Sequence, residues 1–155
     1  MSIVLNRGAE KSTLDDKGRV NIPVRFREHF QGDLIITRGD EHCAMILTPS
    51  EWEYIEQSVE NSDVLTHVER ESYKDKYLNQ ASPVELDNAG RITVPPRIRN
   101  YANLSRESRE CTVVRDKDRL YIWNSADYEA HLEKTDLMAT TARNKINSPI
   151  ISREN

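Results

Sequence analysis

The sequence predicts an α+β protein in which one β-hairpin and short-helix module occurs twice, around a pseudo-twofold, β-barrel-like core with flanking helices. A 17-residue segment recurs without a gap, as LDDKGRVNIPVRFREHF at 14–30 and LDNAGRITVPPRIRNYA at 86–102, with seven identical positions. Each copy places a turn signal before alternating polar and apolar residues, which is typical of a half-buried strand. Such short strands are not stable alone, so the two copies are expected to interlock.

The turn in each copy is predicted from its local chemistry. An Asp side chain can accept hydrogen bonds from the backbone ahead of it, and a Gly three residues later supplies a positive φ without steric cost. A Pro then ends the strand and suits the first turn of a helix, where no N–H is needed. The predicted structural turn residues are Asp15, Gly18, Pro23, Asp87, Gly90 and Pro95.

The strand and the short helix after each turn have opposite apolar and polar faces. In residues 19–22, Val20 and Ile22 are expected to face the core. Arg19 and Asn21, which alternate with them, are expected to face solvent. Phe26 and Phe30 lie four residues apart, which gives the following helix an apolar seam. The module is therefore predicted to run strand, turn, strand, short helix, two strands and helix.

Extending the repeat with small gaps sets the expected domain boundaries. The apolar stretch at 34–38 corresponds to 111–115, and each is followed by a second strand and a polar helix start. The tail after about residue 134 is polar and is expected to be loosely ordered. The predicted domains are a first module over 8–55, a helical acidic connector over 56–83, a second module over 84–128, and a C-terminal helix start with a polar tail over 129–155.

Charge is distributed unevenly along the 155 residues, whose net charge is −4. Residues 41–76 hold three Lys or Arg against nine Asp or Glu, whereas residues 1–30 hold six against four and residues 86–109 five against two. Exposed charges are screened beyond about 10 Å at 0.1 M salt, so a nucleic-acid partner would respond to the local basic segments rather than to the total.

Several classes of protein are disfavoured by the sequence. The apolar run at 2–5 is too short for a signal peptide or a membrane span, which predicts a cytoplasmic protein with no membrane partner. Cys43 and Cys111 lack a CxxC partner and are expected to be reduced, buried thiols. The histidines lack ligand spacing, and no phosphate loop or nucleophile elbow is present. We therefore expect no catalytic residues, metal, cofactor or small-molecule substrate.

Arginine and lysine around the turns are the candidates for contact with double-stranded DNA. Such side chains can reach a phosphate, and Arg can contact the edge of guanine through two hydrogen bonds. The alternative for Arg19 is that it pairs with Asp15 and only holds the hairpin. Ala89 replaces Lys17 in the second copy, which makes the second hairpin a poorer anion binder. The predicted DNA-binding residues are Lys17, Arg19, Arg25, Arg7 and Arg91.

Arg25 and Arg27 are two residues apart on a helix, so their side chains point about 200° apart. Both cannot face one DNA surface. One of them is expected to be a structural ion-pair partner, for which Asp15 and Asp87 are the candidate partners, and Arg25 is favoured for the DNA side.

The paired motifs LDDKGRVNIPVRFRE and LDNAGRITVPPRIRNYANL resemble those of the MraZ family, which has tandem SpoVT-AbrB-type domains. Arg7-Gly8 and the run RLYIW at 119–123 extend the resemblance, whereas Asn6 and Asn103 depart from the family pattern. The resemblance implies a cytoplasmic, nucleoid-associated regulator of the division and cell-wall gene cluster, including its own operon. It also implies a ring-like homo-oligomer that binds short repeated promoter boxes through the hairpin carrying Lys17 and Arg19.

Three other functions remain as alternatives. An AbrB-like antitoxin would bind DNA and sequester a toxin through its tail, but such proteins usually carry a single motif. A β-barrel interaction module could use the same duplicated fold without binding DNA. An enzyme on a double-barrel scaffold has the least support, because the turn aspartates are the only carboxylates repeated at fixed positions.

Overall fold

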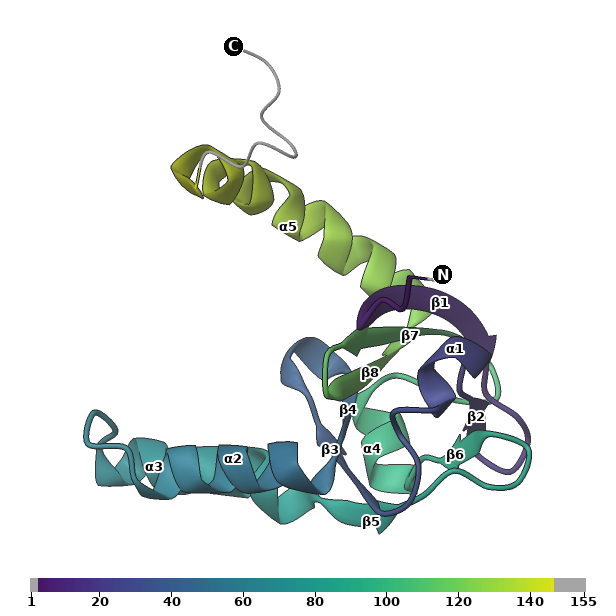
Figure 1. The fold of residues 1–155 in the computed structure, drawn as a ribbon, viewed down its shortest axis with the longest axis horizontal. Coiled ribbons are helices and arrows are strands. Elements are labelled where there is room, and N and C mark those ends of the chain that lie inside the picture. The colour runs from purple at the N-terminus through teal and green to yellow at the C-terminus, as the bar shows by residue number, and fades with distance from the viewer. Residues whose placement is uncertain (1–2, 147–155) are drawn as a thin grey trace. The chain divides into compact units, whose positions relative to one another are not determined.

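The computed structural model describes residues 3–146. The chain divides into two compact units, the second of which begins at Ser125. In the first unit (Figure 1) the strands are β1 (Arg7–Thr13), β2 (Arg19–Asn21), β3 (Leu34–Arg38), β4 (Ala44–Leu47), β5 (Ser82–Val84), β6 (Arg91–Thr93), β7 (Glu110–Asp116) and β8 (Arg119–Asn124). Its helices are α1 (Val24–Arg27), α2 (Pro49–Glu60), α3 (His67–Lys76) and α4 (Pro96–Tyr101), with the 3-10 turns η1 (Asp40–His42) and η2 (Leu78–Gln80).

The main sheet is built from strands of both repeats. Its order is β1-β7-β8-β4-β3-β5, and every neighbouring pair is antiparallel. The first strand of each repeat pairs with the other repeat: β1 lies beside β7, and β5 lies beside β3. The order therefore reads symmetrically outward from the β8–β4 pair. The two copies exchange strands, which confirms that they interlock.

A second, two-stranded sheet joins the repeats at their hairpins. β2 runs antiparallel to β6, with Val20 opposite Ile92. These residues occupy matching positions of the two copies, so a local pseudo-twofold axis passes between them. Both side chains are fully buried, whereas Asn21 and Thr93 on the other face are exposed. The predicted alternation of this strand is confirmed in both copies.

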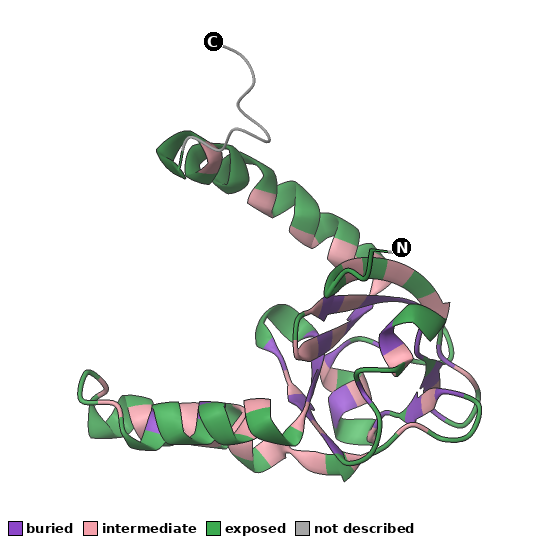
Figure 2. Cartoon of the chain, viewed as in Figure 1, coloured by how far each residue is buried: buried purple, intermediate pink, exposed green. Residues whose placement is uncertain are grey.

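One hydrophobic core lies between the two sheets and the short helices. It includes the fully buried side chains of Val20, Ile22, Phe26 and Phe30, as the strand and helix patterns predict. Figure 2 shows the buried residues concentrated in the strands, while α1 and α4 contribute the buried Phe26 and Ile98. The structure is thus mixed α+β with an antiparallel sheet. A barrel-like core is not confirmed, because among residues 3–146 the six-stranded sheet is open, with β1 and β5 at its edges.

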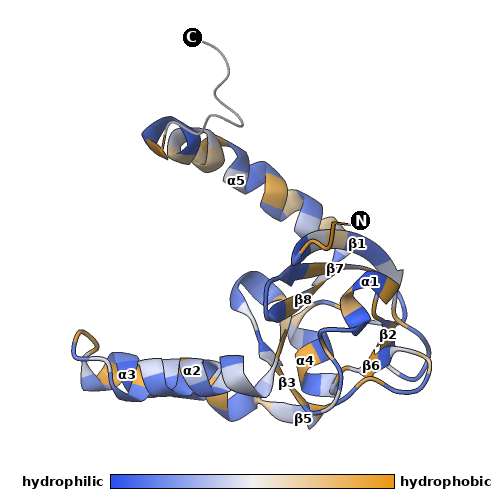
Figure 3. Ribbon diagram, viewed as in Figure 1, coloured by the Kyte–Doolittle hydropathy of each residue, from blue (hydrophilic) through white to orange (hydrophobic). Residues whose placement is uncertain are grey.

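Helices α2 and α3 form a polar helical hairpin between the repeats. The Thr66 hydroxyl and the Glu69 carboxylate each accept a backbone hydrogen bond from the other residue, which forms a capping box at the start of α3. The Arg70 guanidinium donates to carbonyls near the end of α2, including that of Ser62 at 2.9 Å. Figure 3 shows mostly hydrophilic residues along both helices. Trp52 of α2 packs against a small cluster of buried residues around Leu47.

The second unit contains α5 (Ser125–Ile146), which has no buried residue. The helix extends beyond residue 134, so the expectation that the tail is loosely ordered from there is wrong as far as Ile146. The remainder of the predicted tail, 147–155, lies outside the described residues.

Both cysteines are free and buried, as predicted. Burial raises the pKa of Cys43 and of Cys111 to about 12. Both are therefore protonated at neutral pH, and neither is an activated nucleophile.

Lys117 adopts a φ of 55° in the turn between β7 and β8. This left-handed conformation costs a residue with a Cβ roughly 1–2 kcal/mol of strain. Glycine avoids that strain, but its greater conformational freedom in the unfolded chain cancels part of the gain in stability. Lys117→Gly is therefore expected to raise the free energy of unfolding by about 0.5–1 kcal/mol in urea titration. The backbone bonds at this position, from Lys117 N–H to the Asn6 carbonyl and from Arg115 Nε to the Lys117 carbonyl, are retained. Lys117→Ala removes the same side chain without relieving the backbone, and an equal gain from it would contradict this explanation.

Candidate nucleic-acid interface

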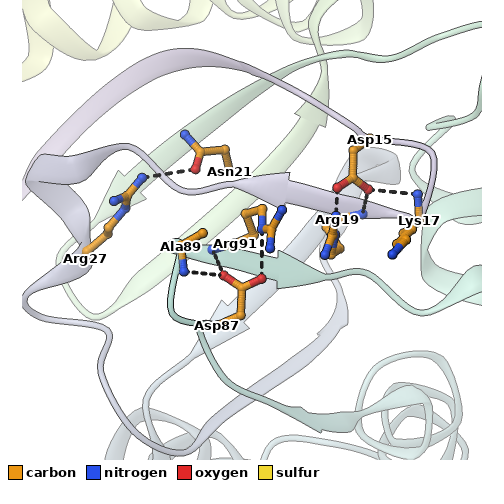
Figure 4. Close-up of polar contacts among 8 residues, drawn as sticks. All are labelled: Asp15, Lys17, Arg19, Asn21, Arg27, Asp87, Ala89 and Arg91. Atoms are coloured by element: carbon orange, nitrogen blue, oxygen red, sulfur yellow. Dashed lines mark hydrogen bonds and ion pairs between the residues drawn. The ribbon is translucent and has the colours of Figure 1, made fainter.

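The first hairpin turn is organised by the Asp15 carboxylate. Its Oδ1 accepts hydrogen bonds from the backbone N–H of Lys17 at 2.9 Å and of Arg19 at 2.8 Å. Its Oδ2 accepts from the Arg19 Nε at 2.7 Å. Gly18 has a φ of 78°, as the turn requires. Asp15 therefore fixes both the turn and the direction of the arginine that follows it (Figure 4).

The second turn repeats this arrangement at matching positions. Asp87 Oδ1 accepts from the N–H of Ala89 and of Arg91, both at 2.9 Å, and Oδ2 accepts from the Arg91 Nε at 2.8 Å. Gly90 has a φ of 80°. The local sequence DxxGR thus produces one geometry twice (Figure 4).

Arg19 and Arg91 stand on the solvent side of the two-stranded sheet. Because side chains alternate along a strand, they lie opposite the buried Val20 and Ile92. The side chains are 25% and 34% exposed, respectively. Each bond to aspartate uses Nε–H, one of five guanidinium donors, so the terminal nitrogens keep donors for another partner.

Lys17 is exposed at the tip of the first turn, and its counterpart Ala89 is neutral. Asp16 beside it is paired with Arg109, which comes from the other repeat. The Arg109 hydrogen bond lowers the pKa of Asp16 below its ordinary value, so this carboxylate is ionised but compensated. Sequence reasoning missed Arg109. Its partner is distant along the chain, and no local motif marks it.

The remaining predicted arginines make other contacts. Arg25 is exposed, pairs with Glu10 of β1 and stacks over the Phe26 ring at 4.7 Å. Arg27 Nε donates to the Ile22 carbonyl at 2.7 Å. One of these two arginines is an ion-pair partner, as expected, but it is Arg25, the one favoured for DNA, and its partner is Glu10. The candidate aspartates were wrong, because each turn aspartate pairs with the arginine four residues after it.

Arg7 is 62% exposed at the start of β1, where its Nη1 lies 2.8 Å from Asp116 Oδ1. Pro23 and Pro95 lie at the N-caps of α1 and α4, one position before the first helical turn in which they were expected.

The turn should loosen in acid. Burial tends to raise the pKa of Asp15, but hydrogen bonds from Arg19 and Lys17 outweigh it and hold the pKa below its ordinary value. The stability that this carboxylate contributes is therefore complete above about pH 4 and is lost as the pH falls through its lower folded-state pKa. The Lys17 and Arg19 amides should then lose protection, measured by NMR as the exchange rate relative to the intrinsic rate at the same pH. In Asp15→Asn, which retains an oxygen acceptor but cannot titrate, this acid-dependent loss of protection should be absent. Its persistence would assign the effect to another group.

Within residues 3–146, no group of three or more His, Cys, Asp or Glu side chains could hold a metal ion. Over the same residues, every helix is too short or too polar to cross a membrane.

Comparison with known proteins agrees with the duplicated architecture. A family model described as "MraZ protein, putative antitoxin-like" matches the chain twice, over residues 5–74 and 77–147. A transcriptional regulator MraZ of Parafrankia sp. is 37% identical over 125 residues, covering 81% of this chain and 85% of the relative. Proteins of the same name from Thermobifida fusca and Saccharopolyspora erythraea are 35% and 30% identical, covering 82% and 90% of this chain and 88% and 94% of the relatives. The chain belongs to the MraZ family.

Proposed function

We propose that the chain is a DNA-binding transcriptional regulator that reads promoter DNA with its β2–β6 ribbon. The observation that carries this proposal is the solvent face of that ribbon, where Arg19 and Arg91 each follow an aspartate-fixed turn. The major groove of DNA admits a two-stranded β-ribbon, and arginine is the commonest reader of guanine. The relatives' names, which call them transcriptional regulators, support the same function.

The first hairpin is the stronger anion-binding element. It presents Lys17 next to Arg19, and the ion pair with Arg109 compensates the neighbouring Asp16. The second hairpin has Arg91 but no lysine. In this proposal the DNA-binding residues are Lys17, Arg19 and Arg91, and the exposed Arg25 and Arg7 are further phosphate contacts.

The finer parts of the proposal follow from the family resemblance. The chain assembles into a ring-like homo-oligomer, has no enzymatic activity, and acts in the cytoplasm at the nucleoid. Its targets are short direct repeats in the promoter of the division and cell-wall gene cluster, including its own operon. Its modules span 8–55 and 84–128, flanked by the connector 56–83 and the C-terminal segment 129–155.

A gel-shift titration tests this function directly. The full chain is mixed with DNA from upstream of its own operon, and a shuffled sequence of equal length serves as control. We expect preferential binding of the upstream DNA. Its affinity should fall steeply as salt rises, because neutralised phosphates release counterions. Equal affinity for both DNAs would exclude sequence-specific regulation, and no binding to either at low salt would exclude a DNA partner.

A further inference from the structure

Each short helix of the repeat sends an arginine to the hairpin of the other repeat. Arg27 of α1 lies against Gly90, where a methyl group on the glycine would be 2.3 Å from the arginine Cζ. Arg99 of α4 lies against Gly18, where the corresponding distance would be 2.7 Å. These are matching positions of the two copies, so the contact occurs twice and crosses between repeats both times.

The two glycines are also held from the other repeat through their backbones. The Ile22 N–H donates to the Gly90 carbonyl at 2.9 Å, and the Val94 N–H donates to the Gly18 carbonyl at 2.9 Å. Each turn is therefore clamped by a strand end and by a guanidinium, and both come from the opposite module. Glycine serves two purposes here, because it allows the positive φ and leaves room for the planar guanidinium.

We propose that Arg27 and Arg99 are positioning residues, each of which holds the DNA-facing turn of the opposite module. This inference rests on the proposed function for its link to DNA, but the positioning itself is a property of the free protein. Arg99 acts on the turn that carries Lys17 and Arg19. Arg27 acts on the turn that carries Arg91.

The two arginine side chains are not anchored equally by hydrogen bonds. Arg27 is anchored by its Nε bond to the Ile22 carbonyl and by an Nη2 bond to Asn21 Oδ1 at 3.0 Å (Figure 4). In the second copy Thr93 stands where the first has Asn21, and the buried Arg99 Nε has no hydrogen-bond partner among the described residues. The first hairpin is therefore the less firmly held of the two, although it has more positive charge to offer DNA.

Hydrogen–deuterium exchange of the full free protein, read by mass spectrometry, tests whether each arginine holds the turn of the opposite module. Arg99→Met should speed exchange of the turn amides at 17–19 by about 3- to 10-fold and leave those at 89–91 unchanged. Arg27→Met should do the reverse. A general loss of stability would speed exchange in both turns and in the core strands. Faster exchange in the variant's own module, in both turns alike, or in neither would overturn the proposal.

Lysine variants extend the test if a methionine variant fails to fold. Arg99→Lys and Arg27→Lys keep the charge and the aliphatic stem but lose the planar group. They should also speed exchange at the turn of the opposite module, but by a smaller factor than the methionine variants. A lysine variant that exchanges like wild type at the opposite turn would show that packing of the guanidinium against the glycine is unimportant.

DNA binding then links the contact to function. Arg99→Met should weaken operator binding in wild type and in an Arg91→Ala background, but add little in a background with both Lys17→Ala and Arg19→Ala, compared at low salt where residual binding is measurable. Additive losses in that double background would overturn a positioning role toward the turn. If wild type binds no operator while the crossed exchange pattern is present, the proposed function fails and the positioning stands.

Discussion

Arg19→Ala should weaken operator binding by about 1–3 kcal/mol for each hairpin engaged, and should remove most detectable binding when several hairpins act together. The substitution deletes the terminal guanidinium donors and also the Nε bond to Asp15. Asp15 Oδ1 keeps its two bonds from the backbone N–H groups of residues 17 and 19, and no cavity opens in the core, so the thermal unfolding midpoint should fall only slightly. Gel shift and titration calorimetry with upstream DNA measure the loss.

The Arg19–Asp15 bond makes a structural explanation possible, and matched variants separate it from DNA contact. If Arg19 only holds the hairpin, Asp15→Asn should cost as much affinity as Arg19→Ala, since both remove the ion pair. If Arg19 touches DNA, Asp15→Asn should be clearly milder. Arg91→Ala provides the counterpart in the second module and should cost less, because Ala89 leaves that turn without a lysine. An Arg19→Ala protein that folds normally and binds like wild type would disprove the hairpin interface.

Inserting half a helical turn, about 5 bp, between two promoter repeats should reduce affinity by about 10²–10⁴-fold. A single hairpin carries few positive charges and should bind weakly. In a ring, hairpins meet successive repeats in the same sense, so binding of the second becomes intramolecular. The insertion turns one repeat to the opposite face of the DNA and should remove that gain.

Two controls make the insertion informative. Adding a whole turn, about 10 bp, restores the face of the DNA and should recover part of the affinity. Light scattering at micromolar concentration should show an oligomer, and a monomer would remove the basis of the argument. Unchanged affinity with the half-turn insertion would show that subunits bind independently.

Local chemistry made the turns predictable from the sequence. The repeated Asp and Gly positions give the observed hydrogen bonds and positive φ, and alternation places Val20 in the core and Arg19 at the surface. The repeat itself indicated that the copies share a core. These features depend on neighbours within a few residues or on exact recurrence, both of which are visible in one sequence.

The unpredicted features depend on partners far along the chain. Asp16 pairs with Arg109, and Arg27 packs against Gly90. Both contacts join segments that only the fold brings together. Helix α5 continues through a polar stretch in which no apolar periodicity marks it, so its extent was underestimated. The barrel-like core was expected from the sequence but is not confirmed, since alternation predicts strands and does not determine which sheet edges pair.

The exchange of strands between repeats bears on how the chain acquires its structure. β1 pairs with β7, so the N-terminal strand has no sheet partner until residues 110–116 have left the ribosome. The first module therefore cannot complete its folding during synthesis, and the high sequence separation of these contacts favours slow folding. Covalent fusion offsets part of this cost. Two separate single modules would have to meet at a concentration-dependent rate, whereas here each finds its complement on the same polypeptide.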